Sequence, residues 1–160
     1  MKRSISILLC TVLLLGLLAA CGSSYKDDVS ISELESAIDS AIGGAGSMIK
    51  APDSYVSFPI QLEASDYAEA CIKLDSQGIN INEYGVFKTS GKEQANALKN
   101  KLESYLSTSI ENWNPAYMPE ELPKLENAVV TVCGNYVMYA ILDSDGRTAA
   151  ENAFENALKG

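Results

Sequence analysis

The sequence predicts an α+β fold in which a small, mostly antiparallel sheet packs with three to four helices. Two observations indicate the sheet: a strand pattern over residues 84–88, and two more over 128–133 and 136–142 that read as a β-hairpin. A third observation indicates the helices, because a long helical pattern over 92–112 separates the first strand from the hairpin and another helical pattern follows it. We expect the helices to lie on the faces of this sheet.

The hairpin is the most sharply defined element, since only Gly134 and Asn135 separate its two strands. Gly and Asn tolerate the positive φ that a tight two-residue turn requires. Along 136–142, apolar residues occupy both alternating sets of positions, so neither face of the strand suits water. We therefore expect the hairpin to be covered on both sides.

Apolar residues spaced three and four apart predict the long helix over 92–112 and an earlier helix over 32–48. A capping box precedes each of them: Ser90 with Glu93, and Ser30 with Glu33. Three glycines weaken the second half of the earlier helix, so it is expected to break there or to pack closely on another element.

The same spacing predicts two further helices. A short helix over 66–74 would carry Tyr67, Cys71 and Leu74 along one side. The final helix would be capped by Asp145. Its apolar side comprises Ala150, Phe154, Ala157 and Leu158.

The N-terminus has the layout of a secretory signal, in which Lys2 and Arg3 precede an apolar stretch. That stretch is at the low limit for crossing a bilayer, which takes roughly 20 apolar residues. Leu18-Ala19-Ala20-Cys21 resembles the bacterial lipobox, in which the cysteine thiol receives a diacylglycerol and the chain is cut just before it. The alternatives are a signal cut at an ordinary small-residue site and an uncleaved anchor helix.

The lipobox prediction divides the chain into three parts. Residues 1–20 form a signal peptide that is cleaved between Ala20 and Cys21, residues 21–29 form a tether, and residues 30–160 form a single α+β domain. We expect a lipid-anchored protein on the extracytoplasmic face of the cell membrane, with acylated Cys21 as its attachment to membrane lipid.

The charge of the mature chain restricts its partners. Removing residues 1–20 takes away Lys2 and Arg3 and no acidic residue, which leaves 10 basic and 21 acidic residues and a net charge of −11. Phosphate backbones and anionic headgroups repel such a chain. We therefore expect no nucleic-acid partner and no adsorption to membranes through a basic face.

Two cysteines, Cys71 and Cys133, remain after Cys10 is removed with the signal and Cys21 is acylated. An exported protein can join them in a disulfide. They can equally be small buried apolar side chains. A domain of this size has a core large enough to be stable without a disulfide, so we predict two free buried thiols.

The residue types exclude much of the usual catalytic chemistry. The chain contains no histidine, which removes Ser-His-Asp and Cys-His triads and most zinc sites. No phosphate-binding glycine loop or nucleophile motif occurs in the mature chain. We expect no catalytic residue, no metal and no cofactor.

Two pairs of carboxylates could in principle act on a sugar bond or bind calcium: Glu120 with Glu121, and Asp143 with Asp145. The second pair fails as a calcium loop, because an EF-hand register would need acids where Ile141 and Asn152 stand. A turn that leads into the final helix is the favoured interpretation.

One loop, residues 113–123, invites a functional hypothesis. It holds the only tryptophan of the chain and three prolines. Rigid aromatic side chains in such a loop suit recognition of a partner, and the candidate binding residues are Trp113, Tyr117, Met118 and Glu120. The alternative is that the aromatic residues fold inward and cap the core after the long helix, as aromatic residues beside a helix end usually do.

Several segments together resemble a family of bacterial lipoproteins that contain a domain of unknown function, DUF4358. They are Tyr84-Gly85-Val86-Phe87-Lys88, Tyr117-Met118-Pro119-Glu120 and Gly134-Asn135-Tyr136-Val137-Met138-Tyr139. The resemblance spans about residues 30–154 and implies a lipobox start and this order of elements. The family often has an Asp-Glu pair before the Phe-Lys strand, where this chain has Asn82-Glu83. The family has no known activity, so the resemblance implies no mechanism.

The expected function is that of a membrane-anchored extracytoplasmic binding or interaction module without chemistry of its own. Its partner would be an envelope protein or another ligand that the sequence does not identify. One alternative is a carboxylate-dependent cell-wall hydrolase. Another is an accessory subunit of an envelope complex or transporter.

Overall fold

The computed structural model describes residues 24–43, 47–114 and 116–160. The predicted signal peptide, its cleavage position at Ala20 and the lipidation site Cys21 lie outside these residues, as does Pro115 of the aromatic loop. Within the described ranges, no helix combines the length and the apolar character needed to cross a bilayer.

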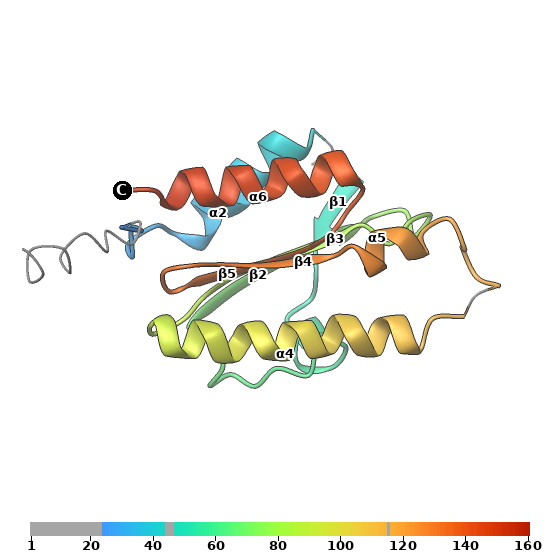
Figure 1. The fold of residues 1–160 in the computed structure, drawn as a ribbon, viewed down its shortest axis with the longest axis horizontal. Coiled ribbons are helices and arrows are strands. Elements are labelled where there is room, and N and C mark those ends of the chain that lie inside the picture. The colour runs from blue at the N-terminus through green and yellow to red at the C-terminus, as the bar shows by residue number, and fades with distance from the viewer. Residues whose placement is uncertain (1–23, 44–46, 115) are drawn as a thin grey trace, which may run out of the picture.

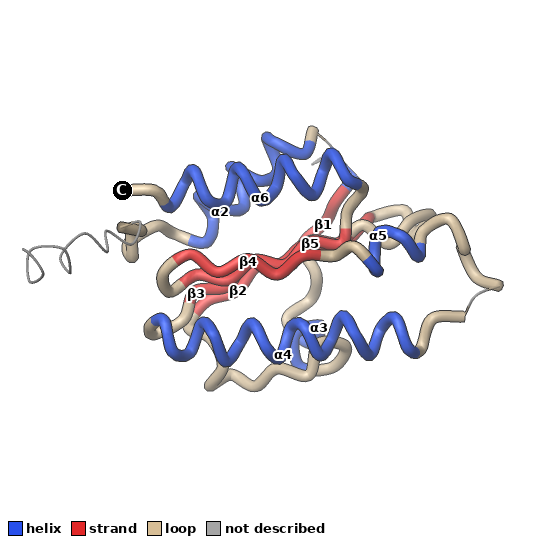
Figure 2. The backbone as a smooth tube through the Cα atoms, viewed as in Figure 1, coloured by secondary structure: helices blue, strands red, loops and turns tan. Residues whose placement is uncertain are grey.

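A five-stranded antiparallel sheet forms the centre of the molecule (Figures 1 and 2). Its strands are β1 Met48–Lys50, β2 Glu69–Asp75, β3 Glu83–Lys88, β4 Val129–Cys133 and β5 Tyr136–Ile141. The spatial order is β1-β2-β3-β5-β4, so β5 of the hairpin lies between β4 and β3. This arrangement confirms the predicted α+β fold with a mostly antiparallel sheet.

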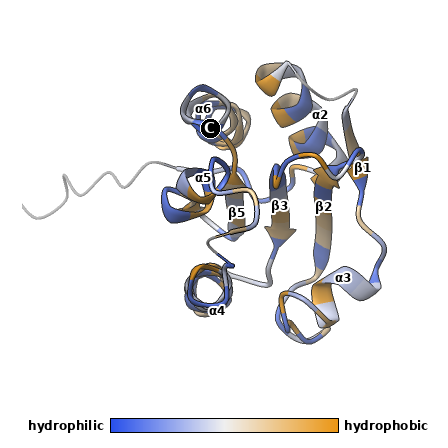
Figure 3. Ribbon diagram, turned by 90° about the vertical axis from the view of Figure 1, so that its right-hand side faces the viewer, coloured by the Kyte–Doolittle hydropathy of each residue, from blue (hydrophilic) through white to orange (hydrophobic). Residues whose placement is uncertain are grey.

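The helices cover both faces of the sheet. They are α2 Ile31–Ile42, α3 Ser54–Ser57, α4 Lys92–Glu111, α5 Leu122–Glu126 and α6 Ser144–Leu158. Helices α2 and α6 pack together on one face, and α4 crosses the other face with the short α3 beside it (Figure 3). We call these the α2/α6 face and the α4 face. The prediction that the hairpin is covered on both sides is confirmed.

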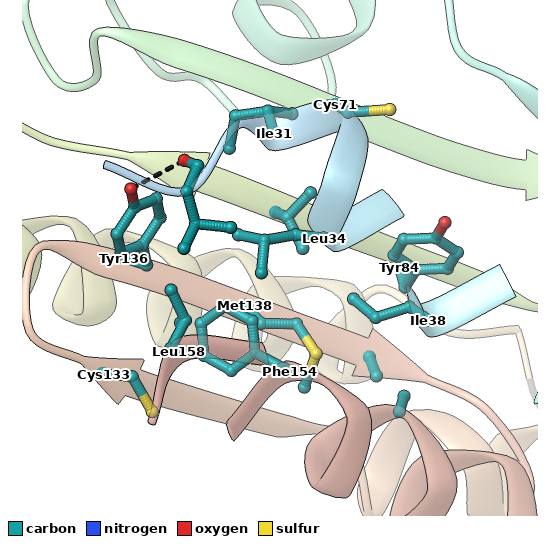
Figure 4. Packing of buried hydrophobic residues seen from close by; sticks show 14 of the residues in the cluster. Ile31, Leu34, Ile38, Cys71, Tyr84, Cys133, Tyr136, Met138, Phe154 and Leu158 are labelled. Carbon is teal, nitrogen blue, oxygen red and sulfur yellow. Dashed lines mark hydrogen bonds between the residues drawn. The ribbon is translucent and has the colours of Figure 1, made fainter. Parts of the chain in front are cut away.

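The core on the α2/α6 face is closely filled (Figure 4). Leu34 and Ile38 of α2 and Phe154 of α6 are fully buried against the sheet. Tyr136 is also buried there, and its hydroxyl donates to the carbonyl oxygen of Val29 over 2.7 Å. Because this bond satisfies a polar group inside the core, it fixes the chain that leads into α2.

The core on the α4 face is built around aromatic residues of the sheet. The buried side of α4 comprises Ala95, Leu98, Leu102 and Leu106. These side chains pack over Phe87 and Tyr139, whose rings are stacked with centroids 6.2 Å apart. Gly85 pairs with Tyr139 across the strands, and a Cβ at Gly85 would lie 2.3 Å from the ring carbon Cε1 of Tyr139. The tyrosine ring therefore occupies the space that a side chain at Gly85 would need.

Both thiols are free and buried, as predicted. Cys71 lies in β2 and Cys133 at the end of β4, and both contribute to the core of the α2/α6 face. Burial is the main reason that the pKa of the Cys71 thiol rises to about 11. A protonated thiol inside the core behaves as a small apolar side chain.

Two element predictions are wrong. The expected helix over 66–74 is strand β2, in which Cys71 and Ile72 are buried in the cores on opposite faces of the sheet. A strand buried on both faces shows apolar neighbours rather than alternation, and a short run of this kind can mimic helical spacing. The expected helix over 32–48 ends at Ile42, because Gly43 adopts a φ of 63° and Met48 begins β1.

The helix caps differ in detail from the predictions. Ser30 caps α2 as expected, since its hydroxyl accepts from the backbone N–H of Glu33 over 3.2 Å. Ser90 pairs with the side chain of Gln94 rather than Glu93 at the start of α4. Asp143, and not Asp145, caps α6, where its carboxylate accepts from the backbone N–H of Gly146 over 2.8 Å.

Candidate functional site

A groove of about 710 Å³ lies on the α4 face, between the second half of α4 and the loop that follows α3. One wall is the loop segment 58–61. The other wall comprises Lys101, Ser104, Tyr105, Thr108, Ser109 and Asn112 of α4. A volume of this size is in the range of small-molecule and chain-ligand sites.

The groove has a mixed lining, in which neutral polar side chains of α4 face apolar surface contributed mainly by the loop wall. Hydroxyl and amide side chains dominate the α4 wall, whereas the phenyl ring of Phe58 on the loop wall is 83% exposed. The one cation in the lining, Lys101, is already paired, because its Nζ lies 2.7 Å from the carboxylate of Asp66. Gln61 stands at a φ of 60°, an uncommon backbone conformation for a residue other than glycine.

A buried carboxylate contacts the α4 wall of the groove through Tyr105. Glu83, at the start of β3, is only 6% exposed and accepts hydrogen bonds from three tyrosine hydroxyls. Tyr55 of α3 donates to Glu83 Oε2 over 2.8 Å, and Tyr105 of α4 donates to Oε1 over 3.2 Å. Tyr139 of β5 also donates to Oε1. Glu83 thus links α3, α4 and the sheet at one point.

The protonation of this cluster follows from its burial. Burial raises the pKa of the Glu83 carboxyl, and the three hydroxyl donors offset part of that rise. Burial and the neighbouring carboxylate together raise the pKa of Tyr105 and Tyr139 well above the usual value for tyrosine. The tyrosines therefore stay protonated and remain donors at neutral pH. The arrangement holds two helices in place and leaves no tyrosinate to act as a base.

The predicted aromatic loop continues directly from the groove, because Asn112 lines the groove and Trp113 begins the loop. Trp113 packs partly against the core of the α4 face, and its ring centroid lies 6.3 Å from that of Tyr117. Tyr117 is 59% exposed and Glu120 is exposed. Met118 is half-buried at a φ of 47°. Trp113 therefore folds toward the core, as the alternative interpretation of this loop expects. Tyr117 and Glu120 are exposed, as a partner-binding loop requires.

Glu121 fixes the far end of this loop. It is buried, and its carboxylate accepts from the backbone N–H of Ile81 over 2.9 Å and from Lys124 Nζ over 2.8 Å. Lys124 also donates to the side-chain oxygen of Asn82 over 3.0 Å. The two neighbouring carboxylates consequently have different environments: Glu120 is exposed to solvent, whereas Glu121 is buried and hydrogen-bonded.

The other candidate carboxylates do not converge. Asp143 is occupied as the cap of α6, and Asp145 is exposed in the first turn of that helix. Among the residues that the structure describes, no three acidic or cysteine side chains meet as a metal ion would require.

Sequence reasoning did not find the Glu83 cluster. The signal was present, because Glu83 is the one acidic residue of a strand that is buried from residue 83 to 87, and it follows Asn82 where the resemblance places an acidic pair. A charged residue in a buried strand needs partners. Its three partners come from residues 55, 105 and 139, which no local pattern connects.

The chain belongs to the family described as domain of unknown function DUF4358, whose model matches residues 47–142. The match begins just before β1 and ends just after β5, so it contains Glu83, its three tyrosines and both walls of the groove. No curated protein and no solved structure matches the chain.

Proposed function

We propose that this protein is a lipid-anchored extracytoplasmic domain that binds an uncharged, polar, chain-like ligand in the groove between α4 and segment 58–61. A cell-envelope glycan is the class of ligand that we favour. The observation that supports the proposal best is a groove that combines neutral polar and apolar lining beside Glu83, which joins α4 to the helix α3 that leads into the loop wall.

The lining chemistry favours a sugar chain over a charged ligand. Hydroxyl and amide groups from Ser104, Thr108 and Asn112 can both donate to and accept from sugar hydroxyls. The exposed ring of Phe58 offers an apolar face against which a sugar ring can stack. Since Lys101 is already paired with Asp66, an ionic ligand would have to displace that carboxylate.

Preorganisation by Glu83 also supports binding. A groove whose walls are already fixed loses little conformational entropy when a ligand enters. Tyr105 belongs to α4, and Tyr55 belongs to α3, which leads into the loop wall 58–61. Because the two tyrosines share one carboxylate, that carboxylate holds the start of the loop wall relative to α4.

The ligand proposal is tested by calorimetric titration of the Cys21→Ser protein with neutral glycan oligomers. We expect saturable binding that Ser104→Arg abolishes, because the arginine side chain would fill the groove. Phe58→Ala should weaken it several-fold. Ile79→Ala is the matched control, because Ile79 is also an exposed apolar residue but lies outside the groove. Equal affinity in all four proteins, or no binding to any glycan, would contradict the proposal. Release of new reducing ends would favour the hydrolase instead.

The anchor is tested separately in cells. Cys21→Ala should release the protein from the membrane fraction or leave its signal uncut, because no thiol remains to receive the diacylglycerol. The mass of the purified protein distinguishes these outcomes. If the variant kept both its membrane retention and its mass unchanged, the lipid anchor would be ruled out.

A further inference from the structure

The two ends of the described chain are paired with each other. Tyr25 and Lys159 form an antiparallel bridge, and the flanking bonds run from Lys26 N to Leu158 O over 2.8 Å and from Gly160 N to Ser24 O over 3.1 Å. The chain therefore joins the domain at Ser24, several residues before helix α2 begins.

The paired ends lie beside the turn of the β-hairpin. A Cβ at Gly134 would lie 3.2 Å from Cβ of Tyr25, which places the hairpin turn against the bridge. The backbone N–H of Thr89 donates to the carbonyl oxygen of Asn135 over 2.8 Å, so the start of α4 is at the same end. We call residues 24–28, 88–93, 134–135 and 158–160 the bridged end.

The chain between the bridged end and the predicted lipid is very short. Cys21 precedes Ser24 by three residues, and three residues span at most about 11 Å when fully extended. A nine-residue tether would leave the domain free to turn over. A link of three residues holds the point of attachment close to the headgroups.

We propose that the bridged end faces the lipid headgroups and that the opposite end of the domain points away from the membrane. This inference rests on the proposed lipidation of Cys21. The opposite end comprises residues 75–82, 111–126 and 143–147 and is called the far end. Figure 1 shows the C-terminus at one side of the molecule and the loop after α4 at the other.

The charges of the two ends support this orientation. The bridged end has four basic residues (Lys26, Lys88, Lys92 and Lys159) and three acidic ones (Asp27, Asp28 and Glu93). The segment 63–69 lies beside it, since Ala68 N donates to Lys88 O over 2.7 Å, and adds the acidic residues Glu63, Asp66 and Glu69. The far end has two basic residues, Lys124 and Arg147. Its seven acidic residues are Asp75, Glu111, Glu120, Glu121, Glu126, Asp143 and Asp145. Both ends are net acidic, but the far end more so, and an anionic bilayer therefore repels the far end more strongly than the bridged end.

The orientation sets where the groove and the aromatic loop lie. Helix α4 has 20 residues and is about 30 Å long, and it runs from Lys92 at the bridged end to Glu111 at the far end. The groove lies along the second half of α4, and Tyr117 lies beyond the end of that helix. Both would therefore be presented to polymers or proteins outside the membrane.

Energy transfer from a single tryptophan tests the orientation. The lipidated full-length protein is reconstituted into phosphatidylglycerol and phosphatidylethanolamine vesicles that carry dansyl headgroups in the outer leaflet. In the wild-type protein the donor is Trp113, the only tryptophan, at the far end. In Trp113→Phe/Lys92→Trp the donor is at the exposed start of α4. We expect several-fold stronger transfer in the double variant, because the rate of transfer to a plane of acceptors falls steeply with the height of the donor above it.

Two outcomes would overturn the inference in different ways. If the wild-type protein floats with the vesicles but transfer is equal from both positions, or stronger from Trp113, the orientation is wrong and the anchor stands. If neither protein floats with the vesicles, the anchor itself fails and the orientation fails with it.

Lengthening the link provides a second test. Ten Gly and Ser residues inserted after Ser23 should remove most of the difference between the two donors, because the domain could then turn over. The same insertion after Gly78, an exposed turn at the far end, should leave the difference intact. If the insertion after Ser23 had no effect, the short link would not be the cause of the orientation.

Discussion

The two faces of the sheet bury charged groups in different ways. On the α2/α6 face, Lys73 Nζ lies 2.9 Å from carboxylates of both Glu35 and Asp39, and Tyr84 donates to Asp39 over 2.8 Å. On the α4 face, Glu83 has no cationic partner among the described contacts and is held by three tyrosine hydroxyls instead.

This difference separates a closed face from an open one. Helices α2 and α6 pack against each other over the sheet, and a cavity of about 330 Å³ lies at their far end. The α4 face has one long helix, so the space beside α4 is left to the groove. On the closed face, Lys73 and its carboxylates form an ion pair at the edge, where water still reaches them. On the open face, Glu83 lies inside the core and receives its hydrogen bonds from neutral donors. The position of α3 and α4 on the open face therefore depends on one carboxylate.

The largest expected effect concerns the closed face. Phe154→Ala should lower the free energy of unfolding by about 3–5 kcal/mol, because the ring is fully buried between α6 and the sheet. Urea denaturation followed by Trp113 fluorescence measures the change. Asn152→Ala, on the exposed side of the same helix, should stay within about 0.5 kcal/mol of the wild type. A loss below about 1 kcal/mol for Phe154→Ala would show that α6 packs loosely.

Removing the carboxylate should be the most costly polar change on the open face. Glu83→Ala leaves Tyr139, which is fully buried, without its acceptor, and the expected loss of unfolding free energy is about 2–3 kcal/mol. The same variant should weaken ligand binding, because Tyr55 and Tyr105 lose their common partner. Glu120→Ala removes an exposed carboxylate and serves as the control. A stable Glu83→Ala protein with unchanged ligand affinity would show that the groove does not need this brace.

A single added methyl group tests how closely the tyrosine ring is held. Gly85→Ala would place a Cβ 2.3 Å from Tyr139 Cε1, so the ring must move, and we expect a loss of about 1–3 kcal/mol in unfolding free energy. Gly91→Ala is the matched control, since no atom lies within 4 Å of the added Cβ and the backbone there is extended. Equal stability of the two variants would mean that Tyr139 has room to move.

The fold was predictable where local chemistry determines it. Gly134 and Asn135 define the hairpin turn, and the helical spacing after Gly91 defines α4, so both elements are where the sequence places them. Strand β2 was missed because its two faces are both covered, which removes the alternation that identifies a strand. The Glu83 cluster was missed for a different reason. It depends on the crossing of α4 over the sheet, and no pattern within the sequence encodes which tyrosines that crossing brings together.

Breaking the ion pair on the closed face should have a smaller effect than losing Glu83. Lys73→Met leaves Glu35 and Asp39 without their cation, but both side chains keep some contact with water. We expect a loss of about 1–2 kcal/mol in unfolding free energy, and part of it should be restored by Glu35→Gln in the same chain. Lys50→Met, at an exposed position of β1, is the control. A larger loss than for Glu83→Ala would reverse the comparison between the faces.

The smallest expected effect is a dependence of stability on pH that arises from Glu83 on the open face. Because burial raises the pKa of Glu83 in the folded protein, the folded state holds this proton more tightly than the unfolded state does. The contribution of Glu83 to stability is therefore present below its unfolded pKa and is lost as the pH rises through its folded pKa.

The wild-type protein should accordingly gain stability relative to Glu83→Gln as the pH falls from 7 toward the ordinary range of glutamate, because the amide does not titrate. Urea denaturation of both proteins at several pH values measures this difference. Glu120→Gln, compared with the wild type in the same way, is the control. It measures the change in stability that results only from removing one charge from an acidic protein. A difference that widened in the opposite direction would mean that the tyrosine donors outweigh burial, and that Glu83 is held as a carboxylate down to low pH.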